Sequence, residues 1–127
     1  GCERNTLNGI PMEAMFVDVI KDREEGSNTN YKDFAQSAVK FHWETQNSVR
    51  QESPTGQSYI KGSREMLLFV RKQKNAAENK YRTLGYVYLG KVTLDKYAGN
   101  KPMQIVWNLK TPMPGSVYEY AATLANV

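Results

Sequence analysis

Cysteine and histidine are almost absent from this sequence, and their scarcity excludes several kinds of site. The 127 residues contain one cysteine, Cys2, and one histidine, His42. One cysteine cannot form an internal disulfide, and a zinc site needs about four Cys, His or carboxylate ligands. A thiol nucleophile needs a neighbouring base, and nothing in the sequence pairs Cys2 with His42. We therefore expect no metal, no cofactor, and a reducing, cytoplasmic location.

Long apolar runs and phosphate-binding loops are also missing. No stretch approaches the ~18 apolar residues of a membrane span, and no charged-then-apolar signal segment opens the chain. The glycines of residues 84–90 lie in an expected strand and lack the helix start of a phosphate loop. His42 and Glu44 fall on one face of an expected strand, where a surface ion pair is a simpler interpretation than an acid–base pair. We therefore predict a domain that is not an enzyme and has no membrane partner.

The net charge of +4 is mild, but it is unevenly distributed. Residues 1–60 hold six Lys/Arg against nine Asp/Glu, whereas residues 61–110 hold eleven against three. Such an asymmetry indicates a polyanionic partner. The alternative is a set of solvated strand edges, because lysine also protects sheet edges against aggregation.

The pattern of apolar residues predicts a sheet with little helix. Alternating or apolar segments predict strands over residues 12–21, 39–45, 64–73, 84–94 and 102–110. Helical spacing predicts short helices over residues 31–39 and 116–124, and polar or Pro/Gly-rich composition predicts loops over residues 22–30, 47–57, 74–80 and 111–115. We expect a single domain, 1–127, of the α+β class. Its architecture would be a small curved, mostly antiparallel sheet or half-open barrel with short flanking helices.

The sequence is rich in side chains that can bind nucleobases. Eight tyrosines, two tryptophans and four phenylalanines accompany many Arg, Lys, Gln and Asn residues. Aromatic rings stack on bases, and amides and cations read base edges. Phe16, Phe69 and Trp107 lie among aliphatic residues and are expected in the core. Trp43, which polar residues follow at once, belongs either to the core or to a pocket floor.

Several segments occur in an order that resembles a known family. They are YKDFAQSAVKFHWETQN (31–47), ESPTGQSYI (52–60), LLFVRK (67–72), TLGYVYLGKV (83–92) and KPMQIVWNLKTPMP (101–114). Together they resemble a C-terminal domain of unknown function found on bacterial DEAD/DEAH-like helicases. Those proteins often carry an N-terminal phospholipase-D-type nuclease, and some are type IV, modification-dependent restriction enzymes. Residues 1–30 show no resemblance.

The resemblance implies a target-recognition domain that works in cis with a helicase motor and a nuclease, both absent from this chain. The sequence begins Gly1-Cys2-Glu3 without an initiator methionine, so we expect a module excised from a longer protein. Recognition domains of such systems commonly resemble SRA/PUA-like barrels that flip a modified cytosine out of double-stranded DNA. Two alternatives remain: a protein–protein coupler that joins motor to nuclease, and a platform for single-stranded nucleic acid.

The resemblance and the charge pattern together predict two sets of binding residues, one for a base and one for phosphates. The loop before Tyr31 is expected to bring the YKD stretch to the end of the sheet where FHWETQN leaves it. The residues expected to bind a 5-methylcytosine base or its surroundings are Tyr31, Asp33, His42, Trp43, Gln46 and Asn47. The cations expected to bind phosphates cluster around one turn and are Arg71, Lys72, Lys74, Lys80 and Arg82.

Overall fold

The chain forms one curved sheet with a short helix near each end, seen in a computed structural model that describes residues 1–20, 32–76 and 79–123 (for Lys80 and Thr123, the backbone alone). Seven strands lie in the order β1-β2-β5-β8-β9-β4-β3. Their bounds are β1 Cys2–Leu7, β2 Ile10–Asp18, β5 Glu65–Arg71, β8 Val87–Ala98, β9 Gln104–Leu109, β4 Lys40–Glu44 and β3 Phe34–Ser37. The β2–β5 pair is parallel and the other pairs are antiparallel, which confirms the expected mostly antiparallel α+β class.

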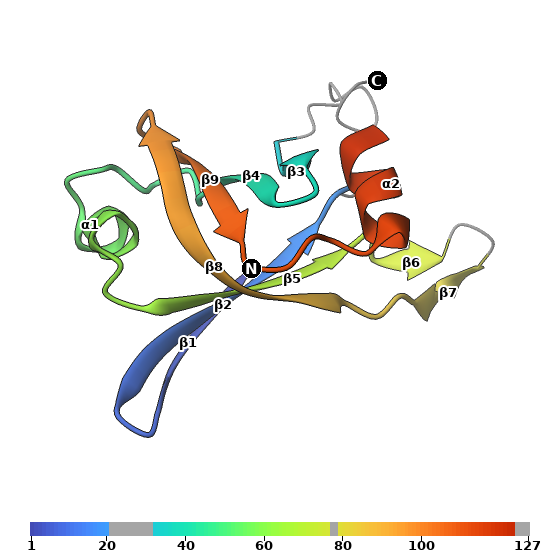
Figure 1. Cartoon of the computed structure of the whole chain (residues 1–127), viewed down its shortest axis with the longest axis horizontal. Coiled ribbons are helices and arrows are strands. Elements are labelled where there is room, and N and C mark those ends of the chain that lie inside the picture. Colours follow the sequence, from blue (N-terminus) through green and yellow to red (C-terminus); the bar gives the residue numbers. More distant parts are fainter. Residues whose placement is uncertain (21–31, 77–78, 124–127) are drawn as a thin grey trace.

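Strand β8 gives the sheet its curvature. Its first half pairs with β5 and its second half with β9, and the register shifts near both Leu68/Phe69 and Leu94/Lys96. Bulges of this kind bend a strand and increase its twist. Figure 1 shows β8 arching between the two halves of the sheet, so that β9 and β4 lie over β2 and β5. The result is a curved sheet that does not close on itself, in agreement with the expected small curved sheet or half-open barrel.

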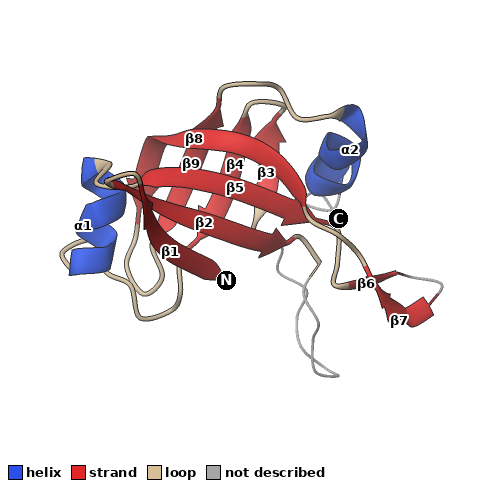
Figure 2. Cartoon of the chain, turned by 90° about the horizontal axis from the view of Figure 1, so that it is seen from below, coloured by secondary structure: helices blue, strands red, loops and turns tan. Residues whose placement is uncertain are grey.

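The two helices lie at opposite ends of the sheet, as Figure 2 shows. Helix α1 spans Pro54–Lys61 and α2 spans Gly115–Thr123, the second in agreement with the helix predicted over residues 116–124. Within the described part of the chain, neither helix is long and apolar enough to cross a membrane.

The concave face of the sheet holds the core. Alternation along the strands points Met15 and Leu68 inward, next to the fully buried Trp107. The same alternation turns Phe16 and Phe69 outward, where their rings stack on each other at 4.9 Å. The expectation that Trp107 is core is therefore confirmed, whereas the same expectation for Phe16 and Phe69 is wrong.

The helix predicted over residues 31–39 is a strand instead. Residues Phe34–Ser37 form β3, an edge strand that pairs antiparallel with β4. The Phe34 ring stacks on His42 of β4 at 4.6 Å, while Ala35 points into the core. Cross-strand packing thus overrides a short helical spacing. The loop predicted over residues 22–30 lies outside the described residues.

Helix α1 begins inside the segment predicted as a loop, residues 47–57. The Ser53 side chain accepts a hydrogen bond from the Gly56 N–H, and Pro54 occupies the first turn. An N-cap serine followed by proline is a helix start, although the same Ser-Pro-Thr-Gly composition also suits a turn. Gly62, at φ 65°, ends the helix.

Two further strand pairs were not predicted. Residues 2–7 form β1, joined to β2 through Asn8 and Gly9, which both have positive φ. The predicted turn over residues 74–80 is a short two-stranded ribbon, β6 (Asn75–Ala76) and β7 (Asn79–Thr83), separate from the main sheet.

Candidate functional site

A pocket of about 280 Å³ lies where the two ends of the curved sheet approach each other. One wall comes from Gly1, Cys2 and the Phe16–Val17 segment of β1 and β2. The other comes from residues 32–33 and from residues 43–47, at the end of β4 and beyond. Because β1–β2 and β4–β3 are the opposite ends of the strand order, this seam pocket occupies the open side of the half-barrel.

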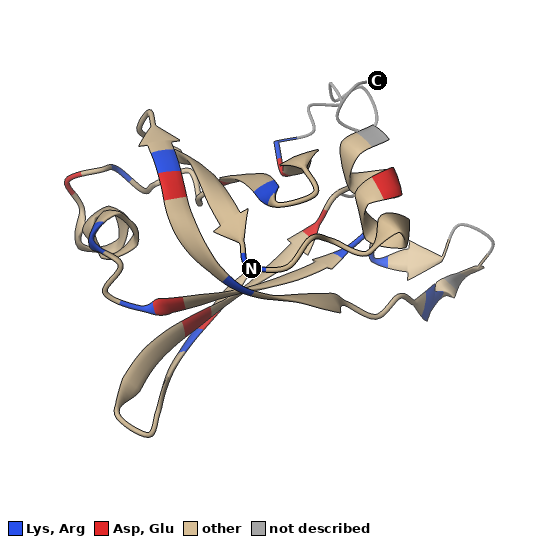
Figure 3. Cartoon of the chain, viewed as in Figure 1, with Lys and Arg blue, Asp and Glu red and all other residues tan. Residues whose placement is uncertain are grey.

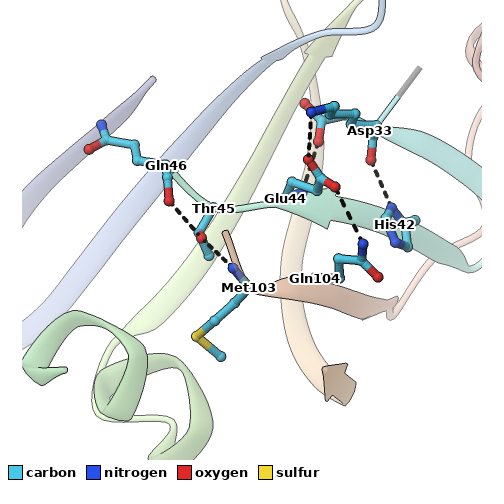
Figure 4. A network of polar contacts seen from close by, with 8 residues as sticks. Asp33, His42, Glu44, Thr45, Gln46, Met103 and Gln104 are labelled. Carbon is cyan, nitrogen blue, oxygen red and sulfur yellow. Dashed lines mark hydrogen bonds and ion pairs between the residues drawn. The ribbon is translucent and has the colours of Figure 1, made fainter. Parts of the chain in front are cut away.

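Thr45 fixes the direction in which the chain leaves β4. Its N–H donates to the Met103 carbonyl at 3.0 Å, and its hydroxyl oxygen accepts from the Met103 N–H at 3.0 Å. The same hydroxyl donates to the Gln46 carbonyl at 3.0 Å. Figure 4 shows the two bonds of the hydroxyl, to Gln46 and to Met103, at the exit from β4. They hold Gln46 and Asn47 at the pocket wall.

Asp33 is a buried carboxylate at the same pocket, with 4% of its surface exposed. Its Oδ1 atom accepts a hydrogen bond from the Glu44 N–H at 2.9 Å. Nearby, Lys32 and Glu44 form an ion pair at 3.6 Å.

Trp43 belongs to both the core and the pocket, the two alternatives left open by the sequence. It is 7% exposed, and its ring packs edge-on against Tyr59 at 5.6 Å and tilted against Trp107 at 6.1 Å. It also lines the seam pocket. An aromatic wall held by two neighbouring rings cannot easily change its orientation.

A second cavity, of about 310 Å³, shares Cys2, Trp43 and Gln46 with the seam pocket. It is lined by the fully buried carboxylate of Glu13, which two hydrogen bonds satisfy. Arg4 Nε donates to one oxygen at 2.7 Å, and the Tyr59 hydroxyl donates to the other at 2.7 Å. The bond from Tyr59 joins α1 to β2.

Burial beside Glu13 raises the pKa of two neighbouring groups, the Tyr59 hydroxyl and the Cys2 thiol. Burial, followed by the hydrogen bond to Glu13, raises the pKa of Tyr59 above its ordinary value of 10.0. Burial, followed by the negative charge of Glu13, raises the pKa of Cys2 from 9.0 to about 12. Cys2 is therefore a protonated, unreactive thiol at neutral pH.

His42 lies on the other face of β4 from Trp43. Its Nδ1–H donates to the Lys32 carbonyl at 2.7 Å, and its ring packs on Phe34. It lines a shallow outer pocket with Gln36 and Gln104. The structure thus separates His42 from the seam pocket, with which the sequence had grouped it.

Of the cations expected to bind phosphates, Arg71 differs most from the expectation, because its side chain is held inside the protein. Its guanidinium makes two bonds to the Asp18 carboxylate, at 2.6 and 3.2 Å, and lies over the Tyr86 ring at 4.1 Å. The side chain is 11% exposed. A guanidinium fixed in this way anchors the sheet. Lys72, Lys74 and Arg82 are exposed, and Lys80 lies in β7.

The structure therefore brings together Asp33, Trp43, Gln46 and Asn47 at one pocket. Tyr31 lies outside the described residues. Sequence reasoning missed Glu13 and Tyr59, because a glutamate is almost never fully buried unless it is paired and no motif links the two residues. Among the described residues, no cluster of three or more His, Cys, Asp or Glu side chains could hold a metal ion.

Comparison with known proteins gives one match. Residues 6–121 match the family model described as "Domain of unknown function (DUF3427)". The match includes residues 6–30, where the sequence itself showed no resemblance. No curated protein and no solved structure matches the chain.

Proposed function

The chain belongs to the DUF3427 family of domains of unknown function, and we propose that it is a non-catalytic DNA-binding domain that reads a modified cytosine by base flipping. The observation that carries the proposal is the seam pocket. Its volume of about 280 Å³ lies near the lower end of the range of small-molecule sites, which suits one nucleobase. Its walls combine an aromatic ring, a buried carboxylate and two amides.

Each of these groups has a counterpart on cytosine. The exocyclic amino group of cytosine is a donor that a carboxylate accepts, which is the role proposed for Asp33. The amides of Gln46 and Asn47 can pair with the remaining donors and acceptors of the base. Trp43 provides a rigid apolar wall for the ring and for a methyl group at C5.

The free energies are compatible with flipping. Extruding a base costs a few kcal/mol. An aromatic stack returns roughly 1–3 kcal/mol, and one good polar pairing returns about the same. Two such contacts offset extrusion, while phosphate contacts by exposed cations supply affinity. The methyl group adds only about 0.8 kcal/mol of burial, so strong preference for 5-methylcytosine also requires a close fit of the pocket.

The wider assignment rests on the resemblance of residues 31–114 to a C-terminal domain of bacterial DEAD/DEAH-like helicases, some of which are modification-dependent restriction enzymes. In this proposal the domain works in the cytoplasm as the target-recognition module of a modification-dependent helicase/nuclease, with motor and nuclease in cis. An SRA/PUA-like barrel is consistent with the half-open sheet. No catalytic step is assigned to the domain itself.

The proposal is tested with the variant Asp33→Asn. The asparagine Oδ1 can still accept from the Glu44 N–H, but the amide presents a donor where cytosine also has a donor. Fluorescence anisotropy should show binding to a 5-methylcytosine duplex weakened by roughly 1–3 kcal/mol, the value of one base contact. Binding to the same duplex without the modification should change little, because it depends on phosphates.

Gln104→Ala is a matched control. Gln104 bonds weakly to Glu44, at 3.5 Å, and lines the outer pocket rather than the seam pocket. It should leave both affinities unchanged. Equal weakening on both duplexes by Asp33→Asn would place base recognition elsewhere. Absence of any DNA binding by the parent chain would favour the protein–protein coupler instead.

A further inference from the structure

We propose that a cavity between α1 and β8 binds a small phosphate monoester that carries a flat organic body, as a nucleoside monophosphate does. The cavity has a volume of about 290 Å³. Its walls come from the end of α1 and the residues after it, the start of β5, residues 91–94 of β8, and Trp107 and Lys110 in and just after β9. This α1–β8 cavity shares no lining residue with the seam pocket, so the inference does not depend on base flipping.

The lining of the α1–β8 cavity carries more positive than negative charge. Arg64, Lys91 and Lys110 line it, against one acidic residue, Glu65. Lys91 Nζ lies 3.0 Å from Glu65 Oε2, so these two charges offset each other. Within the described part of the chain, the side chains of Arg64 and Lys110 form no ion pair or hydrogen bond. Figure 3 shows a basic and an acidic segment where the chain enters β5, and a further basic segment in β8.

A phosphate monoester matches this charge better than other common anions do. It carries about −1.5 to −2 charges at pH 7 and offers three acceptor oxygens. A carboxylate or a phosphate within a DNA strand carries about −1. The guanidinium of Arg64 can bind phosphate through two parallel N–H donors, and Lys110 adds a charge on a flexible stem. The two side chains together supply what a dianionic group requires.

The rest of the lining is apolar and aromatic. Met66 and Val92 point into the core, and each is 4% exposed. The rings of Tyr59 and Trp107 pack edge-on at 6.2 Å, which holds both in a fixed orientation. Such a wall suits a flat organic body and gives nothing to a free inorganic ion. The ligand class is therefore an organic phosphate rather than phosphate itself.

Trp107 also supplies a hydrogen-bond donor. Its Nε1 atom is buried, and no group among the described residues accepts a hydrogen bond from it. An indole N–H can only donate, and a buried donor without a partner is unfavourable. Because Trp107 lines the cavity, we assign this N–H to an acceptor on the body of the ligand, such as a ring nitrogen or a hydroxyl.

The experiment titrates the isotope-labelled 127-residue chain with adenosine monophosphate, cytidine monophosphate and phenyl phosphate, and follows the indole N–H signals by NMR. The chain has two tryptophans, and a Trp43→Phe variant identifies the signal of Trp107. At least one probe should bind and shift that signal. Its counterpart without phosphate (adenosine, cytidine or phenol) should bind at least about tenfold more weakly, because it lacks the charged group.

Substitutions then locate the phosphate. Arg64→Gln and Lys110→Gln should each weaken binding of the probe about tenfold or more, as expected for the loss of one charge-assisted hydrogen bond. Lys61→Gln is the matched control, because Lys61 is an exposed cation in the last turn of α1 that does not line the cavity. It should leave the affinity unchanged. Asp33→Asn, in the seam pocket, should also leave it unchanged.

A phosphate monoester has two sources, a free nucleotide and the 5′-phosphorylated end of a DNA strand. If the cavity takes a DNA end, a 5′-phosphorylated duplex should bind more tightly than its 5′-hydroxyl counterpart, and Arg64→Gln should remove the difference. If the cavity takes a free nucleotide, the two duplexes should behave alike while the probe still binds.

Three results would overturn the site: no binding by any of the three probes, binding that leaves the Trp107 signal in place, or equal weakening by Lys61→Gln and Arg64→Gln. None of these results bears on base recognition at the seam pocket, which Asp33→Asn tests on a modified duplex.

Discussion

Tyr59→Phe is expected to destabilise the protein, although it removes a single oxygen atom. The hydroxyl of Tyr59 donates to Glu13 Oε2 at 2.7 Å, and both residues are almost completely buried. A hydrogen bond to a charged group contributes about 1.5–3 kcal/mol. Phenylalanine retains the ring contacts with Trp43 and Trp107, so the change tests the hydroxyl alone.

The assay is urea unfolding followed by tryptophan fluorescence, because Trp43 and Trp107 both pack on Tyr59. With a denaturant slope of about 2 kcal/mol per M, the expected loss shifts the midpoint by roughly 1 M. In a Glu13→Gln background the same substitution should cost less, about 0.5–1.5 kcal/mol, because the acceptor is then neutral. Tyr118→Phe, on the exposed side of α2, is the control and should change stability by less than about 0.5 kcal/mol.

A loss below about 0.5 kcal/mol for Tyr59→Phe would refute the reasoning, since a buried carboxylate deprived of one donor cannot be neutral to stability. Equal losses in the parent and Glu13→Gln backgrounds would also contradict it. Either result would mean that α1 is held against β2 by packing rather than by this bond.

Two further predictions concern the same region. Gly56→Ala should lower the free energy of unfolding by about 1–3 kcal/mol in urea, because the new Cβ would lie 2.0 Å from the Arg50 carbonyl oxygen. The control is Gly85→Ala, whose Cβ would meet nothing within 4 Å and should cost little. Equal effects of the two substitutions would contradict the close packing at Gly56. Stability should also fall as pH rises from about 9 toward about 12, because the unfolded Cys2 thiol ionises while the folded thiol, with its raised pKa, keeps its proton. Cys2→Ala should lessen this fall, to which Tyr59 also contributes above about pH 10 because its pKa is raised as well. An unchanged curve would show that burial does not hold the thiol proton.

Much of the sheet could be predicted because its strands carry strong alternation. The segments containing β2, β4, β5, β8 and β9 were identified with shifted ends, and α2 was placed within a residue. The missed strand β1 has a signal, since Asn8-Gly9 is a preferred two-residue hairpin turn. The residues of β1 are polar and mostly exposed, so they show no apolar alternation from which a strand could be predicted. The conformation of β1 depends on its pairing with β2.

The candidate site was predictable only in part. The polar exit of FHWETQN and the YKD stretch drew attention to Asp33, Trp43, Gln46 and Asn47, which the fold does bring together. His42 was grouped with them by proximity in sequence, yet strand alternation sends it to the opposite face. Glu13 and Tyr59 are 46 residues apart, and only the placement of α1 against β2 joins them. Nothing in the sequence distinguishes Arg71 from an exposed cation, and only the fold places Asp18 beside it.

The central claim is that the seam pocket receives a base extruded from duplex DNA. The most direct measurement places 2-aminopurine next to 5-methylcytosine in a duplex and follows its fluorescence as protein is added. Loss of stacking on the extruded neighbour should raise the fluorescence in step with binding, and Asp33→Asn should reduce the rise at equal occupancy. Tight binding without any rise in fluorescence would contradict base flipping.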